Sequence, residues 1–185
     1  SFHPYEKVNC KPGKGEYILY HGNLGVAENR RAAEHLIKNV FSKISHPVII
    51  AGLNPSASLY EWVKGHEHIT IIPDPKEPQM QELLENAHVH CLYTHQATGL
   101  KLKLLNVLYS GRFCVCNDHM LEGTSLQATC IVKNSPEEII AEINSCFKKE
   151  FTSQMVEERK ESLVIFDNDH KTRQLIRSVF ASKKI

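Results

Sequence analysis

Short apolar segments alternate with longer amphipathic segments along most of the chain. Strand-like apolar runs occupy residues 16–22, 47–52, 68–73, 89–93, 113–117 and 130–133. Helical spacing of apolar residues is found at residues 30–44, after Ser56, at residues 77–86, and in a run that ends at Ser110. Further helices are predicted at residues 136–147, 153–164 and 168–181. This alternation is typical of a parallel sheet that is covered on both faces.

The pattern predicts an α/β fold, a Rossmann-like three-layer α/β/α domain with a six-stranded parallel sheet. Residues 1–15 are polar and rich in turn residues, so we interpret them as a lead-in or linker segment. Residues 16–150 form the domain, and residues 151–185 form C-terminal helices that pack on it. Sheets of this kind bind ligands at the carboxyl ends of their strands, which here points to residues 21–29, 73–78 and 94–101. The glycine fingerprint of dinucleotide sites is absent after the first strand, so NAD or FAD has little support.

The run that ends at Ser110 combines an apolar helix with two lysines. It begins at the small turn Thr98–Gly99, and because it is apolar on nearly all sides we expect the helix to be buried. Lys101 and Lys103 lie in its first turns, where the helix dipole disfavours a cation by roughly 0.3–1 kcal/mol. One interpretation is a phosphate site made of amide groups, a permissive glycine and two ammonium groups. In the alternative, both lysines extend along the apolar face to solvent.

Composition excludes several classes of protein. The formal net charge is +1, so no bulk field attracts nucleic acid, and we expect no nucleic-acid partner. No apolar run reaches the length of a transmembrane helix, and no signal peptide is visible. The first residue is Ser, which is consistent with a processed chain or a fragment. The six cysteines include no CxxC pair, and Cys91, Cys114 and Cys116 lie in predicted strands, so we interpret them as apolar core residues in a reducing compartment.

Histidines offer two weaker candidates. His88, His90, Cys91 and His95 are close in sequence, and His88 and His90 would share one face of a strand. Their spacing fits no standard zinc pattern, so structural or surface histidines are the favoured interpretation and no metal is expected. His21 ends the first predicted strand near the ligand edge, where it could contact a phosphate or serve a structural role.

Two segments carry a resemblance to a known family. HGNLGVAEN after the first strand, and TGLKLKLLNVLYSGRFCVCND followed by MLEGTSL, resemble the C-terminal domain of group 1 (family 4) glycosyltransferases. The resemblance covers about residues 17–147 and is strongest to a divergent bacterial branch. These are retaining enzymes with two Rossmann-like domains in the GT-B architecture. The resemblance implies that this domain holds the nucleotide-sugar donor, while the acceptor binds mainly to an N-terminal domain.

The family motif has two glutamates eight positions apart, separated by a glycine-containing turn. By the resemblance, the glutamates fall at Thr98 and Asn106, which could still hydrogen-bond a sugar and a ribose hydroxyl. Gly99, Leu100 and Lys101 match the turn whose backbone amides meet the donor diphosphate.

The family often carries an arginine just after the glycine of the first strand, here Gly22, and a lysine five residues later. Asn23 and Glu28 occupy those positions, so the side chains usually credited with donor contact are replaced. Lys101 and Lys103 could supply the lost positive charge. The resemblance therefore implies diphosphate contacts at Gly22, Asn23, Gly99, Leu100, Lys101 and Lys103, and sugar or ribose contacts at Thr98 and Asn106.

The resemblance also implies the partners and location. We expect a UDP- or GDP-sugar donor, a hexose-type sugar transferred with retention, and a glycan or lipid-linked acceptor in polysaccharide biosynthesis. No catalytic side chain, cofactor or metal is expected in this domain. Its missing partner is the N-terminal Rossmann-like domain, without which the fragment would be inactive. The expected location is cytoplasmic, with peripheral contact to the inner membrane face through a longer protein. Two alternatives remain open: a nucleotide-binding or regulatory Rossmann-like module, and a domain that has lost donor binding and serves as an interaction surface.

Overall fold

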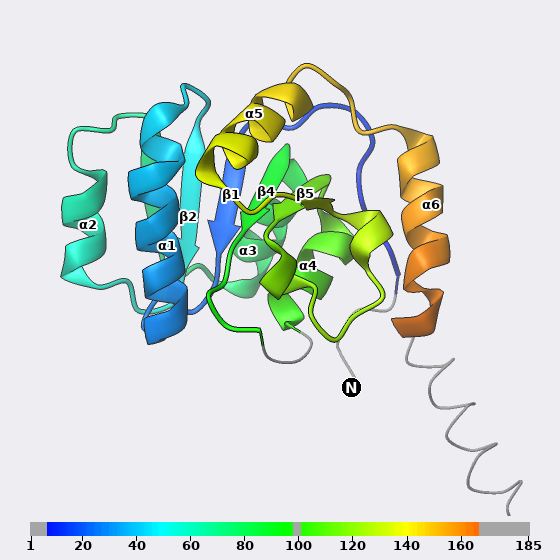
Figure 1. Ribbon diagram of the computed structural model, residues 1–185, viewed down its shortest axis with the longest axis horizontal. Helices are drawn as coiled ribbons and strands as arrows, with labels where there is room; N and C mark the ends of the chain where they lie inside the picture. Colours follow the sequence, from blue (N-terminus) through cyan, green and yellow to red (C-terminus); the bar gives the residue numbers. More distant parts are fainter. Residues whose placement is uncertain (1–6, 98–100, 167–185) are drawn as a thin grey trace, which may run out of the picture.

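The computed structural model describes residues 7–97 and 101–166 of the 185-residue chain. Its centre is a parallel sheet with strand order β3-β2-β1-β4-β5-β6, the order of a doubly wound fold (Figure 1). The strands are β1 (Ile18–His21), β2 (Val48–Gly52), β3 (Ile69–Pro73), β4 (Val89–Leu92), β5 (Phe113–Cys116) and β6 (Ile131–Val132). The predicted three-layer α/β/α fold is confirmed. Two register pairs join β1 to β4, Ile18 with Val89 and Leu19 with His90, whereas four join β1 to β2.

The helices are α1 (Ala27–Asn39), α2 (Ala57–Val63), α3 (Glu77–Asn86), α4 (Leu102–Ser110), α5 (Pro136–Cys146) and α6 (Ser153–Leu163). The bounds predicted for α3 are confirmed, and α5 begins at a capping box in which Ser135 and Glu138 hydrogen-bond each other's backbone amides. The helix predicted at residues 168–181 lies outside the described residues.

The first predicted helix is wrong at its end. We expected it to continue to Ile44, but α1 ends at Asn39 and a 3-10 turn, Phe41–Lys43, follows. Side chains explain the change, because the Asn39 amide donates to the His35 carbonyl and the Ser42 hydroxyl donates to the Lys38 carbonyl. Such local hydrogen bonds compete with the α-helical ladder.

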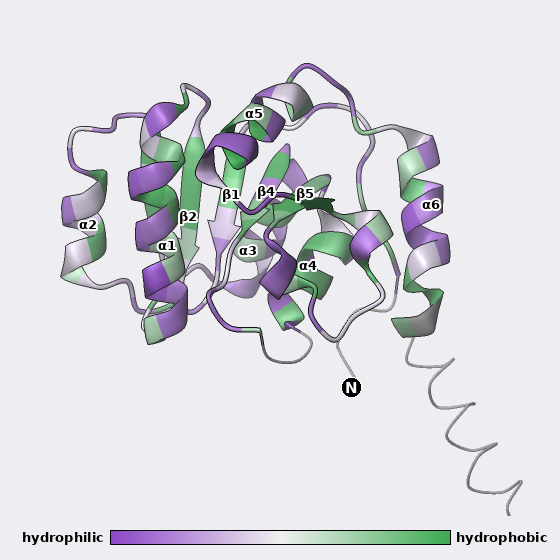
Figure 2. Ribbon diagram, viewed as in Figure 1, coloured by the Kyte–Doolittle hydropathy of each residue, from purple (hydrophilic) through white to green (hydrophobic). Residues whose placement is uncertain are grey.

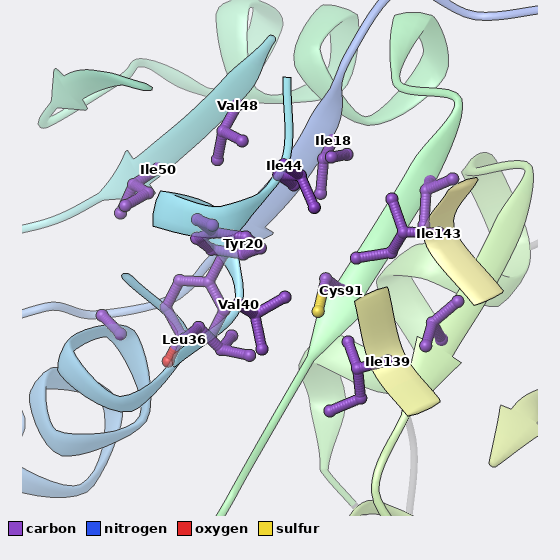
Figure 3. Packing of buried hydrophobic residues seen from close by; sticks show 14 of the residues in the cluster. Ile18, Tyr20, Leu36, Val40, Ile44, Val48, Ile50, Cys91, Ile139 and Ile143 are labelled. Atoms are coloured by element: carbon purple, nitrogen blue, oxygen red, sulfur yellow. The ribbon is translucent and has the colours of Figure 1, made fainter. Parts of the chain in front are cut away.

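The sheet separates two clusters of buried apolar residues. On one face, residues of β1 and β2 such as Ile18 and Ile50 pack under α1 and α5, together with Cys91 of β4 (Figure 3). On the other face, Leu19 and the cysteines of β5 pack under α3 and α4. Strand β2 is hydrophobic along its length, while α1 presents hydrophilic residues outward (Figure 2). Burial on both faces is the reason that the strands read as continuous apolar runs.

Helix α4 is buried except at its start. Leu104, Leu105, Val107 and Leu108 are inaccessible to solvent, as predicted, but 54% of Leu102 is exposed. The expectation that the helix is buried all round is therefore wrong in its first turn. Leu102 is the first residue of the helix, whereas the residues from Leu104 onward pack in the core.

Both ends of the described chain lie against the domain. In the segment interpreted as a lead-in, the Asn9 amide donates to the Tyr109 carbonyl, and Gly13 forms an antiparallel bridge with Phe151. Helix α6 stands beside the β5 side of the sheet (Figure 1). Its buried Arg159 donates hydrogen bonds to the carbonyl oxygens of Gly111 and Arg112.

Candidate functional site

A cavity of about 390 Å³ lies at the carboxyl edge of the sheet; we call it the strand-end cavity. The ends of β1 and β2, the segment from Pro75 into α3, and one residue of α4 enclose it. Polar groups come from His21, Asn23 and Asn106, and an apolar wall comes from Leu53, Met80 and Leu84. The cavity lies at the edge of the sheet where the sequence predicts ligand binding, and the topology brings segments far apart in the sequence together there.

The backbone at this edge has unusual conformations. Asn54 and Asp74, just after β2 and β3, have positive φ angles of 53° and 46°. The Asn54 amide donates to the Asp74 carboxylate at 2.7 Å, which ties the two strand ends together. Asn and Asp tolerate this left-handed region better than other residues. Gly52 is required by close approach, because a Cβ there would lie 1.7 Å from the Gly22 carbonyl oxygen.

His21 faces the strand-end cavity. Its side chain is buried, and neither ring nitrogen has a hydrogen-bond partner among residues 7–97 and 101–166. Burial, reinforced by the charge of Lys103, lowers the pKa of His21 to about 3, so the ring is neutral at physiological pH. A neutral imidazole offers one donor and one acceptor. Leaving a buried polar group unpaired costs about 1–3 kcal/mol, which a ligand could offset.

Lys103 points toward the start of α1. Its ammonium donates to the Asn29 side-chain oxygen at 2.7 Å and lies 5.3 Å from the centre of the Tyr20 ring. Burial lowers the pKa of Lys103 to about 8, against the opposing effect of Glu28. The interpretation in which both lysines extend to solvent is wrong for Lys103, because its ammonium is held by polar and aromatic partners. Lys101 is half-buried at the first position before α4, and burial lowers its pKa too.

Glu28 has a role that the sequence did not reveal. One of its carboxylate oxygens accepts hydrogen bonds from the Thr94 hydroxyl at 2.8 Å and the His95 amide at 2.6 Å. Partial burial acts to raise the pKa of Glu28, but these hydrogen bonds outweigh it and hold the pKa below its usual value. Asn117 exchanges two further hydrogen bonds with the Thr94 backbone. Glu28 therefore holds the start of the segment that follows β4, at Thr94 and His95.

Several predicted site residues meet at this edge, and others cannot be placed. His21, Gly22, Asn23 and Asn106 line the strand-end cavity. Asn23 is connected to Lys103 through Asn29, which donates to the Asn23 carbonyl oxygen and accepts from the Lys103 ammonium. The Asn23 side chain itself accepts from the Gly25 amide. Thr98, Gly99 and Leu100 lie outside the described residues.

The histidine cluster does not assemble. His88 precedes β4, and its ring nitrogens pair with the Gly15 amide and the Cys146 carbonyl, on the α5 side of the sheet. His90 faces the α4 side, where a Cβ on Gly111 would lie 2.1 Å from its ring. The expectation that His88 and His90 share a face is therefore wrong, because the strand alternation begins only at Val89. Within residues 7–97 and 101–166, the group of side chains close enough together to hold a metal ion is Cys114, Cys116 and Cys130. The sequence missed Cys130, which no short motif connects to the other two.

Comparisons with known proteins agree with this architecture. The family model described as "Glycosyl transferases group 1" matches residues 15–149. A search of curated proteins finds no significant match. In the described parts of the chain, no helix has the length and apolar character needed to cross a membrane.

Solved structures share the fold at low sequence identity. A glycosyltransferase from Rickettsia africae superposes with a TM-score of 0.66 and 11% identity, covering 92% of this chain and 49% of that one. TarM from S. aureus, crystallised with UDP, Fondaparinux and alpha-GlcNAc-glycerol, gives 0.62 and 10%, covering 95% and 36%. An alpha,alpha-trehalose-phosphate synthase from Burkholderia xenovorans, with glucose-6-phosphate, gives 0.57 and 11%, covering 85% and 41%. The chain thus spans half or less of the length of each of these proteins.

Proposed function

Because the chain belongs to the group 1 family of glycosyl transferases, we propose that it is the donor-binding domain of a retaining enzyme. The proposed reaction transfers a hexose-type sugar from a UDP- or GDP-sugar to a glycan or lipid-linked acceptor. One observation carries the proposal: the strand-end cavity joins an apolar wall to His21, whose ring nitrogens lack a partner among the described residues, and Asn29 connects the cavity residue Asn23 to Lys103. That combination suits a ligand with a flat base, a hydroxylated sugar and a diphosphate.

The nucleoside would occupy the strand-end cavity. Its volume of about 390 Å³ falls within the range of roughly 300–1,000 Å³ that small-molecule sites have. Leu53, Met80 and Leu84 provide an apolar wall for the base, and Asn106 is placed to hydrogen-bond ribose hydroxyls. His21 could pair one of its free ring nitrogens with the same ligand.

The diphosphate would lie between the β1–α1 loop and the start of α4. Lys101 and Lys103 would supply positive charge there, next to the amino terminus of α4, where a helix favours an anion. Asn29 acts as a positioning residue, because it holds the Lys103 ammonium at 2.7 Å. Stabilising the leaving diphosphate is the task that retaining transfer sets for this domain, so no side-chain nucleophile is required here. Gly22 and Asn23 border this position, and Thr98, Gly99 and Leu100 belong to the same proposal.

The acceptor and the second domain complete the proposal. TarM was crystallised with UDP, and the trehalose-phosphate synthase with a sugar phosphate, which supports a nucleotide donor and a sugar-containing acceptor. Since those proteins are at least twice as long as the matched region, we propose that an N-terminal domain brings the acceptor. The isolated chain would bind the donor but not transfer its sugar. The longer protein would act in the cytoplasm or at the inner membrane face.

Calorimetric titration with UDP, GDP and UMP tests donor binding. We expect Lys103→Met and Lys101→Ala each to weaken UDP or GDP binding by about 1.5–3 kcal/mol, the usual loss for a charged hydrogen bond. The same two substitutions should weaken the binding of UMP less, because UMP lacks the second phosphate. Asn106→Ala should weaken all three nucleotides by about 0.5–1.5 kcal/mol.

Lys64→Met is the matched control. Lys64 follows α2 at the amino-terminal edge of the sheet, and its side chain is 79% exposed. This substitution removes one positive charge at a distance from the strand-end cavity, so affinities should not change. Absence of nucleotide binding, or equal losses in Lys64→Met and Lys103→Met, would contradict the proposal.

An interaction surface is the second candidate, and exposed apolar residues favour it. Three residues near the carboxyl ends of the strands are each about half exposed: Val26 just before α1, Leu53 just after β2, and Leu102 at the start of α4. The same residues suit contact with a second domain. If nucleotides fail to bind but the chain associates with its N-terminal domain, and Leu102→Ser weakens that association, the interaction role replaces donor binding.

A further inference from the structure

Three cysteine side chains converge at the β5–β6 side of the sheet. Cys114 and Cys116 are two positions apart on β5, so their side chains point to the same face. Strand β6 pairs with β5 in a register that sets Val115 opposite Ile131, which places Cys130, the preceding residue, opposite Cys114. The three sulfur atoms all lie within 4.8 Å of one another. Register, rather than sequence proximity, therefore creates the cluster.

A buried positive charge lies at the same place. A second cavity, of about 190 Å³, is lined by Cys114, Cys130, Thr129 and the guanidinium-bearing Arg159 of α6. Only 4% of Arg159 is exposed, and it forms no ion pair with any described residue. Its hydrogen bonds go to the carbonyl oxygens of Gly111 and Arg112 and to the sulfur of Cys10. A buried cation is normally compensated by negative charge, and nearby thiolates would supply it.

We propose that Cys114, Cys116 and Cys130 bind a thiophilic closed-shell cation, Zn²⁺ or Cu⁺, through three thiolates. Soft thiolate ligands select these ions over Mg²⁺ or Ca²⁺. A metal–sulfur distance of about 2.3 Å corresponds to sulfur–sulfur distances of about 3.8–4.0 Å, so the cluster needs to contract by less than about 1 Å. Three thiols release three protons as the ion binds. The three thiolates and a divalent ion leave one net negative charge, which the Arg159 guanidinium balances.

Zn²⁺ and Cu⁺ differ in whether they take a fourth ligand. Zn²⁺ prefers four ligands, and the cavity beside Cys130 gives access to a water molecule. Cu⁺ would take the three thiolates alone. Cys130 is the partly exposed member, whereas Cys114 and Cys116 are each 1% exposed, so the ion would enter from the Cys130 side. The resulting bond would tie β5 to the segment that enters β6.

Cobalt and zinc titrations of the reduced, metal-free chain test the site. We expect one equivalent of Co²⁺ to produce thiolate charge-transfer absorption in the near ultraviolet, and one equivalent of Zn²⁺ to abolish it. X-ray absorption of the zinc form should show three sulfur ligands at about 2.3 Å. Cu⁺ affinity is measured by anaerobic competition with bathocuproine disulfonate and compared with the affinity for Zn²⁺. The ion that binds more tightly and at one equivalent is the resident ion.

The variants use cysteines on both sides of the sheet. Cys130→Ser should lower zinc affinity at least 100-fold while keeping the far-ultraviolet circular dichroism of the parent chain. Cys91→Ala is the matched control, because Cys91 is a buried strand cysteine on the opposite face (Figure 3). The proposal would be overturned by any of three results: zinc bound to the wild-type chain without sulfur ligands, no stoichiometric binding of either ion, or equal losses of zinc affinity in Cys91→Ala and Cys130→Ser. In that case the thiols are apolar packing residues.

Discussion

The pKa of Lys103 makes donor affinity depend on pH in a calculable way. The free chain has a Lys103 pKa of about 8, because burial disfavours the charged form. A bound diphosphate would restore the charged form, since an adjacent anion raises the pKa of an ammonium group. The affinity should therefore follow the protonated fraction of Lys103 in the free chain. That fraction is about 0.9 at pH 7 and about 0.1 at pH 9, which predicts a roughly tenfold loss, or about 1.4 kcal/mol.

The measurement is calorimetric titration with a UDP- or GDP-sugar between pH 7 and pH 9. A nucleotide sugar is preferable to a free nucleotide, because a terminal phosphate has its own ionisation near pH 6. At pH 8, titrations in buffers of different ionisation enthalpy should show uptake of about half a proton per ligand bound. His21 should not contribute, since its pKa is about 3. Lys101 also has a lowered pKa, so Lys101→Ala serves to separate its share.

The variant Lys103→Met tests whether Lys103 causes the pH dependence of donor affinity. The variant should bind more weakly at pH 7, and its affinity should change little between pH 7 and pH 9. A flat profile in the parent chain, or an equal slope in Lys103→Met, would refute the assignment of the diphosphate contact to Lys103.

Three further predictions concern stability. Lys103→Met should raise the thermal midpoint of the ligand-free chain at pH 7, because the lowered pKa of Lys103 means that burying its charged form is unfavourable. Above pH 8 the lysine of the parent chain is increasingly neutral, so the difference in thermal midpoint should shrink. Calorimetric scans at pH 7 and pH 9 measure this difference. Gly111→Ala should destabilise the chain by about 1–3 kcal/mol in urea unfolding, because the new Cβ would lie 2.1 Å from the buried His90 ring. Glu28→Gln should speed amide exchange at His95, and in the parent chain the stabilising contribution of Glu28 should fall as pH drops through its lowered pKa.

Local patterns were sufficient for most of the elements. The bounds of α3 and the start of α5 at Pro136 depend on residues within a few positions of each other, which is why both could be predicted from the sequence. The end of α1 differed because the Asn39 and Ser42 side chains compete for backbone carbonyls, a choice that apolar periodicity does not register. The parallel sheet followed from the alternation of strands and helices alone.

The candidate site was harder to predict from the sequence, because its geometry depends on contacts between segments that are distant in the chain. The direction of the Lys103 side chain is set by Asn29 and Tyr20, which lie more than seventy positions earlier. Glu28 looked like a lost lysine in the family pattern, yet it anchors the loop that follows β4. Cys130 joins Cys114 only through strand register. None of these pairings has a short-range signature in the sequence.

The short ladder between β1 and β4 has a consequence for how the domain responds to a ligand. Only two register pairs connect the β1–β2–β3 half of the sheet to the half that begins at β4. The strand-end cavity sits above this seam, with His21 contributed by one half and Asn106 by the other. A molecule that contacts both would therefore bridge one of the two shortest ladders in the sheet. If the proposed donor binds there, its occupancy of the cavity should make the two halves open less often as separate units.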